Sequence, residues 1–199
     1  MKKRSRSRPC EVLLTSVFVL GEGLLEAVGL SPAAYAQSPS EYEVKAVFLY
    51  NFAKFVEWPS ELPSDASDPF VIGIVGRDPF GTAVEQSLLR KTLNGRPLAI
   101  KRFRNEQDAR GCQVLYISAS ERKRVKPLLA SLQGDPVLTV GDTEEFVQAG
   151  GVIAFTLEDN RVRFEINMDA AQQAGLKISS KLLSLAKIVW SNLPAASRQ

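Results

Sequence analysis

The sequence contains no histidine, and only two of its 199 residues are cysteine. Histidine is the usual general base of serine and cysteine hydrolases and the commonest metal ligand in proteins. Its absence excludes the most frequent catalytic and metal-binding arrangements, so we expect no catalytic residue, no metal site and no cofactor. Glu22 and Glu26 interrupt the apolar stretch near the N-terminus, which leaves it far short of the roughly 20 residues of a membrane-spanning helix.

The first 36 residues have the features of an export signal. A basic start, MKKRSRSR, precedes an apolar run over residues 12–21, and the sequence Ala-Tyr-Ala at 34–36 supplies the small residues that signal peptidase recognises. We therefore expect a signal peptide over residues 1–36 and a single domain over residues 37–199. A basic arm that binds nucleic acid is the alternative interpretation of the same start.

Charge in the remaining chain is nearly balanced. Removal of residues 1–36 leaves 163 residues, enough for one domain with a sizeable core. These residues carry 20 basic and 19 acidic groups, so the net charge falls from +3 to +1. A balance of this kind provides no polyanion-binding face, and we expect no nucleic-acid partner.

A long amphipathic helix is predicted at the start of the domain. Ser40 and Glu43 form a capping-box pattern, and apolar residues then recur with helical spacing as far as Trp58, before Pro59. The apolar face is wider than one core contact requires. It fits either a deeply buried helix or a helix with an exposed docking stripe.

Strands and helices alternate after this helix. We predict strands over 70–75, 97–103, 112–117 and 137–140, with helices over 80–89, 119–132 and 143–149, and a hairpin of strands 152–157 and 161–166. Asp78 and Asp142 are the expected N-caps of the first and third of these helices. The fold class is therefore α/β: a single domain with a mostly parallel sheet flanked by helices and an antiparallel C-terminal hairpin at its edge.

Three motifs are candidate sites. The stretch GIVGRDPFG has Arg77 beside a helix start, but its spacing matches no phosphate-binding motif and a plain turn is the simpler interpretation. Cys112 begins an apolar strand without a residue to lower its pKa, so a buried structural role is favoured over an intermolecular disulfide. The acid pairs at 144–145 and 158–159 fit a helix start and a hairpin tip.

The stretch RFEINMDAAQQAGLKISSKLLSLAK is the most patterned part of the chain. Asn167 follows a strand, Asp169 can cap a short helix over 170–174, and Gly175 can end that helix. Ser179 or Ser180 can cap a second helix, whose apolar residues are Leu182, Leu183, Leu185, Ala186 and Val189. Because each polar residue has a structural role, the stretch is expected to close the fold.

Several segments together resemble the YfiR-type family of periplasmic repressors. They are YEVKAVFLYNFAKFVEWP, GGVIAF and RFEIN followed by AGLKISSKLLSLA, and the resemblance covers residues 41–189. It implies a non-catalytic, homodimeric periplasmic protein that binds the periplasmic part of an inner-membrane diguanylate cyclase and holds it inactive. An outer-membrane lipoprotein of the OmpA type sequesters such a repressor, which releases cyclic-di-GMP synthesis and biofilm formation. Some relatives carry disulfides that affect their stability. Cys112 matches a family cysteine at the start of a strand, but no other cysteine remains in the mature chain.

A repressor that acts by contact needs an exposed apolar surface. The expected partner-binding residues come from the first and last helices, and some of them must belong to the core: Phe48, Tyr50, Phe52, Trp58, Leu182 and Leu185. The alternative function is a receptor for an amino acid or nucleotide that feeds a membrane sensor. In that case the ligand-binding residues are Arg77, Arg161 and Arg163, the last two also being candidates for the rim of a partner interface.

Overall fold

The computed structural model describes residues 39–59, 68–88, 90–104, 109 and 111–190. All of them lie in one compact unit, Ser38–Gln199. The expected signal peptide lies outside the described residues. None of the helices in the described ranges is long and apolar enough to cross a membrane.

Eight strands form one sheet in the order β10-β8-β7-β6-β5-β2-β4-β3. Five neighbouring strands, from β7 to β4, are parallel, whereas β8 is antiparallel to β7 and β3 is antiparallel to β4. The strands span Phe70–Val75 (β2), Thr92–Leu93 (β3), Arg96–Phe103 (β4), Val114–Ile117 (β5), Leu138–Gly141 (β6), Ile153–Glu158 (β7), Arg161–Asn167 (β8) and Lys187–Val189 (β10). The predicted α/β fold class, with a mostly parallel sheet and an antiparallel C-terminal hairpin, is confirmed.

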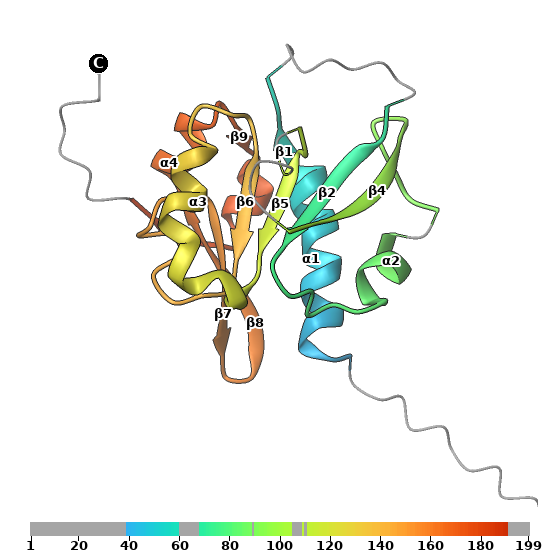
Figure 1. Ribbon diagram of the computed structural model, residues 1–199, viewed down its shortest axis with the longest axis horizontal. Coiled ribbons are helices and arrows are strands. Elements are labelled where there is room, and N and C mark those ends of the chain that lie inside the picture. The colour runs from blue at the N-terminus through green and yellow to red at the C-terminus, as the bar shows by residue number, and fades with distance from the viewer. Residues whose placement is uncertain (1–38, 60–67, 89, 105–108, 110, 191–199) are drawn as a thin grey trace, which may run out of the picture. The chain divides into compact units, whose positions relative to one another are not determined.

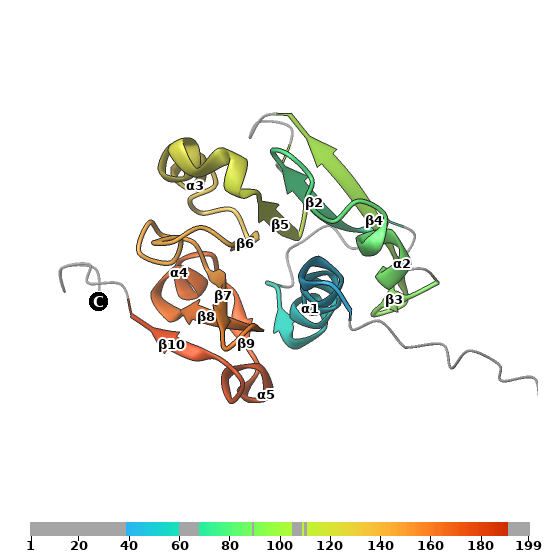
Figure 2. The same ribbon diagram turned by 90° about the horizontal axis from the view of Figure 1, so that it is seen from below.

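Helices cover both faces of this sheet. The sheet curls around α1 (Glu41–Phe55), and α2 (Ala83–Leu88) lies beside α1 on the same side (Figure 2). The opposite face is covered by α3 (Val125–Ser131), which directly follows the 3₁₀-helix η2 (Ala119–Arg124) (Figure 1). Alternate residues of β2 pack on opposite faces of the sheet. Ile72 and Ile74 pack on the α1 side, and Val71 and Val75 pack on the α3 side. Burial of both faces explains why this strand is apolar throughout.

The first helix ends three residues before the predicted position. Its N-terminus has the expected capping box, in which Ser40 Oγ accepts from the Glu43 backbone N–H and Glu43 Oε2 accepts from the Ser40 N–H. At the other end, β1 (Val56–Glu57) is extended and pairs with β9 (Lys177–Ile178). The prediction was wrong because this pairing with a distant segment gives the backbone partners that a further helical turn would otherwise supply.

The predicted helix over 143–149 is also absent, since the loop after β6 consists of turns. Glu145 has φ of 63°, which a helix does not allow. The ring of Phe146 packs where a Cβ at Gly141 or Gly151 would lie, within 2.5 and 2.1 Å of its atoms. Glycine at both positions therefore makes room for Phe146, which anchors the loop in the core.

The long helix predicted over 119–132 is divided in two, and its proline explains the division. Pro127 is the third residue of α3, where a backbone N–H has no partner within the helix. In one helix from residue 119 the same proline would fall in the interior and break a hydrogen bond. The predicted cap Asp78 does not start a helix. Its Oδ1 accepts from the Phe80 N–H and its Oδ2 accepts from Arg102, whereas α2 begins only at Ala83.

The C-terminal hairpin is not the edge of the sheet. The segment Lys187–Val189, predicted as part of a helix, is the strand β10 and pairs in parallel with β8. The last helix, α5 (Ser180–Leu183), is only one turn long, with Ser179 as its N-cap. Pairing with the outer side of β8 gives these backbone groups partners that a continued helix would otherwise have provided.

Asn167 closes this part of the fold. It is fully buried and caps α4 (Met168–Gln173), because its Oδ1 accepts from the Ala170 N–H at 3.0 Å. Its Nδ2 donates to the carbonyl of Val147 at 2.7 Å, which ties the loop after β6 to the end of β8. The predicted cap, Asp169, was therefore wrong by two residues. The predicted stop at Gly175 is confirmed by its φ of 66°.

Asn167→Ala should lower the free energy of unfolding by about 2–4 kcal/mol, since it removes two buried hydrogen bonds and leaves the Val147 carbonyl without this donor. Urea unfolding followed by circular dichroism measures the change. The matched control is Asn51→Ala on the half-buried side of α1, where alanine favours the helix and stability should be kept. Equal effects of the two substitutions would contradict the role given to Asn167.

Candidate functional site

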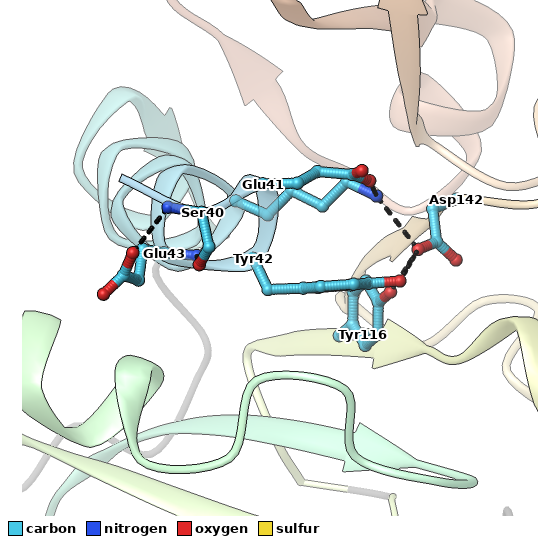
Figure 3. A network of polar contacts seen from close by, with 7 residues as sticks. Ser40, Glu41, Tyr42, Glu43, Tyr116 and Asp142 are labelled. Carbon is cyan, nitrogen blue, oxygen red and sulfur yellow. Dashed lines mark hydrogen bonds and ion pairs between the residues drawn. The ribbon is translucent and has the colours of Figure 1, made fainter. Parts of the chain in front are cut away.

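A buried polar network joins the first turns of α1 to the carboxyl edge of the sheet (Figure 3). At its centre is Asp142, which directly follows β6. Its Oδ2 accepts hydrogen bonds from the Tyr116 hydroxyl at 2.7 Å, Lys45 Nζ at 3.1 Å and the Tyr42 hydroxyl at 3.3 Å. Lys45 Nζ also lies 2.6 Å from Glu41 Oε1. Three segments far apart in the sequence, namely α1, β5 and the start of the loop after β6, are thus held at one carboxylate.

The local structure explains how these side chains meet. Glu41 and Lys45 are four residues apart on α1 and therefore share a helix face. Tyr116 and Asp142 lie on β5 and just after β6, which are neighbouring strands. The ring of Phe80 packs edge-on against both tyrosines, with centroids 5.6 Å from Tyr42 and 4.7 Å from Tyr116.

Burial and charge shift the pKa values of this network. Burial alone lowers the pKa of Lys45, but Glu41 and Asp142 outweigh it, so the pKa of Lys45 is raised and the ammonium stays charged. Burial, together with Asp142, raises the pKa of Tyr116 and of Tyr42. Both hydroxyls therefore keep their protons and act as donors to Asp142.

The network was missed by the sequence analysis. Asp142 was expected to cap a helix, and neither Lys45 nor Tyr116 was assigned a role. Two features of the sequence are weak signals of a buried polar network. One is a lysine within an otherwise apolar helix face, and the other is an aspartate directly after a buried strand. Neither signal shows that the two residues meet, because they are 97 positions apart.

The predicted partner-binding residues have different environments. Phe52 and Leu182 are 0% and 2% exposed, so they belong to the core and cannot contact a partner in the folded protein. They lie on the side of α1 and α5 that faces the sheet. Phe48, Tyr50 and Trp58 are half-buried against that core, while Leu185 is 65% exposed.

Two exposed apolar residues were not anticipated. Ile188 is 44% exposed and Trp190 is 61% exposed, in and directly after β10. We define Leu185, Ile188 and Trp190 as the C-terminal apolar segment. It begins in the turn after α5 and ends just after β10, an outer strand of the sheet (Figure 2). The sequence signal was the β-branched pair before Trp190, which is more typical of a strand than of the predicted helix.

The three arginines predicted to bind a ligand do not form one site. Arg77 is exposed after β2, while Arg161 and Arg163 are exposed on β8. Three strands separate β2 from β8, a distance of roughly 19 Å at the usual strand spacing. Arg77 instead donates its backbone N–H to Ser120 Oγ at 2.9 Å. Ligand binding by any one of them stays a prediction.

Cys112 is buried, as the sequence favours, and its thiol donates to the carbonyl of Ala109 at 2.9 Å. Burial raises the pKa of this thiol to about 12. It is therefore a neutral core side chain. Within the described ranges, no three histidine, cysteine or acidic residues are grouped so that they could hold a metal ion.

The chain matches a family model described as YfiR/HmsC-like over residues 42–187. This match covers almost all of the described domain.

One solved structure with a TM-score above 0.5 has a similar fold. A conserved domain protein from Vibrio cholerae O1 biovar El Tor has a TM-score of 0.51 at 13% identity, over 75% of this chain and 60% of that protein. Two further proteins have TM-scores below 0.5. The ABC domain bound to L-Trp from Streptococcus pneumonia gives 0.47 at 11% identity, over 60% of this chain and 55% of that one. CD0873, a ligand-free, open substrate-binding protein with adhesive properties from Clostridium difficile, gives 0.48 at 10% identity, over 73% and 58%. The chain thus spans about 60% of the length of these proteins, and identities this low show the fold alone.

Raising the pH above about 10 should lower the free energy of unfolding. The unfolded chain loses tyrosine protons at the ordinary pKa of 10.0, whereas the folded protein retains those of Tyr42 and Tyr116. Lys45, with an ordinary pKa of 10.5 that is also raised, acts in the same direction at higher pH. Below these values both states are protonated and the stabilisation is complete.

The test is urea unfolding between about pH 8 and about pH 11. Tyr116→Phe should make the alkaline loss shallower, and Tyr50→Phe, which keeps the network intact, should not. An identical pH dependence in all three proteins would contradict the assignment.

Cys112 should react slowly with iodoacetamide in the folded protein at about pH 8, because a buried thiol of raised pKa supplies almost no thiolate. Peptide mapping by mass spectrometry separates its label from that of Cys10. The control is the protein unfolded in urea, in which labelling of Cys112 should become fast. Equal rates with and without urea would show that the thiol is accessible.

Proposed function

The chain belongs to the YfiR/HmsC-like family, whose members are non-catalytic periplasmic regulators, and from this premise we propose that it represses an inner-membrane signalling protein by binding its periplasmic part. The partner we propose is a diguanylate cyclase. Repression then lowers cyclic-di-GMP and limits biofilm formation. An outer-membrane lipoprotein of the OmpA type relieves the repression by sequestering the regulator. The regulator reaches the periplasm through the signal peptide 1–36 and acts as a homodimer.

The observation that supports binding by contact is the C-terminal apolar segment. Its three large apolar side chains are exposed within six residues of one another. Tryptophan is among the residues that most often dominate the energy of an interface. The segment also includes Ile188 of β10, whose outer side pairs with no strand of the described sheet. An extended partner segment can therefore add to β10 through backbone hydrogen bonds while its side chains contact the apolar residues.

Repression requires more than attachment. A regulator can shift the equilibrium between the active and inactive states of its partner only if it binds one state more tightly than the other. The size of the shift is set by the difference between these two affinities. The C-terminal apolar segment provides this difference when the cyclase exposes the complementary apolar surface in its inactive state alone.

The double variant Leu185→Ser/Trp190→Ser should weaken capture of the cyclase at least about tenfold, since it removes two exposed apolar side chains from the interface centre. Crosslinking in intact cells measures capture, and the cyclic-di-GMP content should rise to that of a deletion strain. Thermal stability should stay close to that of the wild type, because both side chains are mostly exposed.

The matched control is Leu157→Ser, an exposed leucine at the end of β7. It should leave capture unchanged. Undiminished capture by the double variant would place the interface elsewhere. If deletion of the gene leaves cyclic-di-GMP unchanged in a strain with an intact cyclase, the proposed partner is wrong.

A further inference from the structure

A cavity of about 550 Å³ lies beside the polar network, at the carboxyl edge of the sheet. Its walls are the first turns of α1, the loop after β6, and parts of β7 and β8. Cavities of roughly 300 to 1,000 Å³ are typical of small-molecule sites. This one therefore has room for a small organic ligand.

Asp142 lines this cavity and carries a carboxylate oxygen that receives no donor. The side chain is only 6% exposed, and Oδ2 receives three donors. Its Oδ1 is buried and accepts no hydrogen bond from any described residue. In Figure 3 this second oxygen points away from Tyr42 and Tyr116. A buried carboxylate oxygen without a donor is costly, so a donor from a ligand is favoured there.

The charge around Asp142 is negative. Glu41 and Asp142 share a single cation, Lys45, which leaves one excess negative charge in the network. Further along the wall, Glu144 and Glu165 are paired with Arg122 and Lys187, but Glu145 adds another carboxylate.

The surroundings restrict the ligand to one chemical class. An anion would be repelled by the excess negative charge of the wall, and the described residues offer no group of three metal ligands. Phe155, Leu157 and Val147 add apolar surface to the same wall. Arg161 and Arg163, on the same strand as Glu165, do not line it.

We propose that this cavity binds a small organic amine, whose ammonium group donates to Asp142 Oδ1 and whose apolar body packs on Phe155, Leu157 and Val147. The ammonium supplies both missing features, a donor for the buried oxygen and a charge opposite to the excess. The site is distinct from the arginine-anchored receptor expected from the sequence, and its ligand is of opposite charge. It does not depend on the proposed membrane partner.

The test is isothermal titration calorimetry with 2-phenylethylamine as the probe. The protein is purified from cells with whatever processing the cell has carried out, and it is not truncated further. Two comparison compounds separate the contributions. 2-Phenylethanol keeps the apolar body without the charge, and trimethyl(2-phenylethyl)ammonium keeps the body and the charge without an N–H donor. We expect both to bind at least about tenfold more weakly than the amine, as for loss of a charge-assisted hydrogen bond. Equal binding of all three, or no binding of the amine, would overturn the proposal.

Two substitutions locate the site. Asp142→Asn should weaken binding of the amine at least about tenfold, whereas the matched control Asp159→Asn, at the exposed hairpin tip, should not change it. Thr156→Trp fills the cavity from β7 without altering Asp142 and should abolish binding. Retention of full affinity by Thr156→Trp would show that the amine binds elsewhere.

A measurement on the unaltered protein covers the case in which Asp142→Asn or Thr156→Trp fails to fold. Amide NMR signals of residues 143–147 should shift on addition of 2-phenylethylamine, because this loop forms one wall of the cavity. Signals of the C-terminal apolar segment should shift less. Shifts confined to other parts of the chain would refute the site, whatever the outcome of the partner experiment.

Discussion

The packing of α1 into the curled sheet is the interaction on which the rest of the structure depends. Leu49 and Phe52 are completely buried, and the ring of Phe52 lies 5.5 Å from Phe155 and 5.0 Å from Phe164, between their centroids. Each such aromatic side chain contributes about 2–3 kcal/mol through burial. Because α1 packs against strands from both halves of the sheet, its position sets the distance between the two halves.

The polar end of the same helix fixes its orientation. Desolvation of Lys45 and Asp142 offsets much of their attraction, so the pair adds little net stability. Its geometric effect is larger, since a rotation of α1 would leave buried charges without partners. The same requirement brings the loop after β6 to the helix, and the cavity lies between them. One constraint therefore accounts for both the helix position and the proposed amine site.

The two proposed binding regions meet at a single ion pair. Glu165 of β8 lines the cavity, and its Oε1 lies 2.6 Å from Lys187 Nζ of β10, next to Ile188 of the C-terminal apolar segment. Binding at each region relies on non-reactive groups: a carboxylate oxygen in the cavity and apolar side chains on the outer strand. This arrangement agrees with membership of a regulatory, non-catalytic family.

The sequence by itself determined the elements whose causes are local. The capping box of Ser40 and Glu43, the apolar run of β2 and the stop at Gly175 each depend on residues within a few positions, and all three could be predicted. The tertiary structure decided the rest. The end of α1 depends on pairing with β9, the strand character of Lys187–Val189 on pairing with β8, and the role of Asp142 on a lysine 97 positions away. Likewise, Phe52 and Leu182 are core rather than surface because of the strands and helices that cover them. Helical periodicity shows which side chains share a face, whereas the segment that covers this face is chosen only when the whole chain packs.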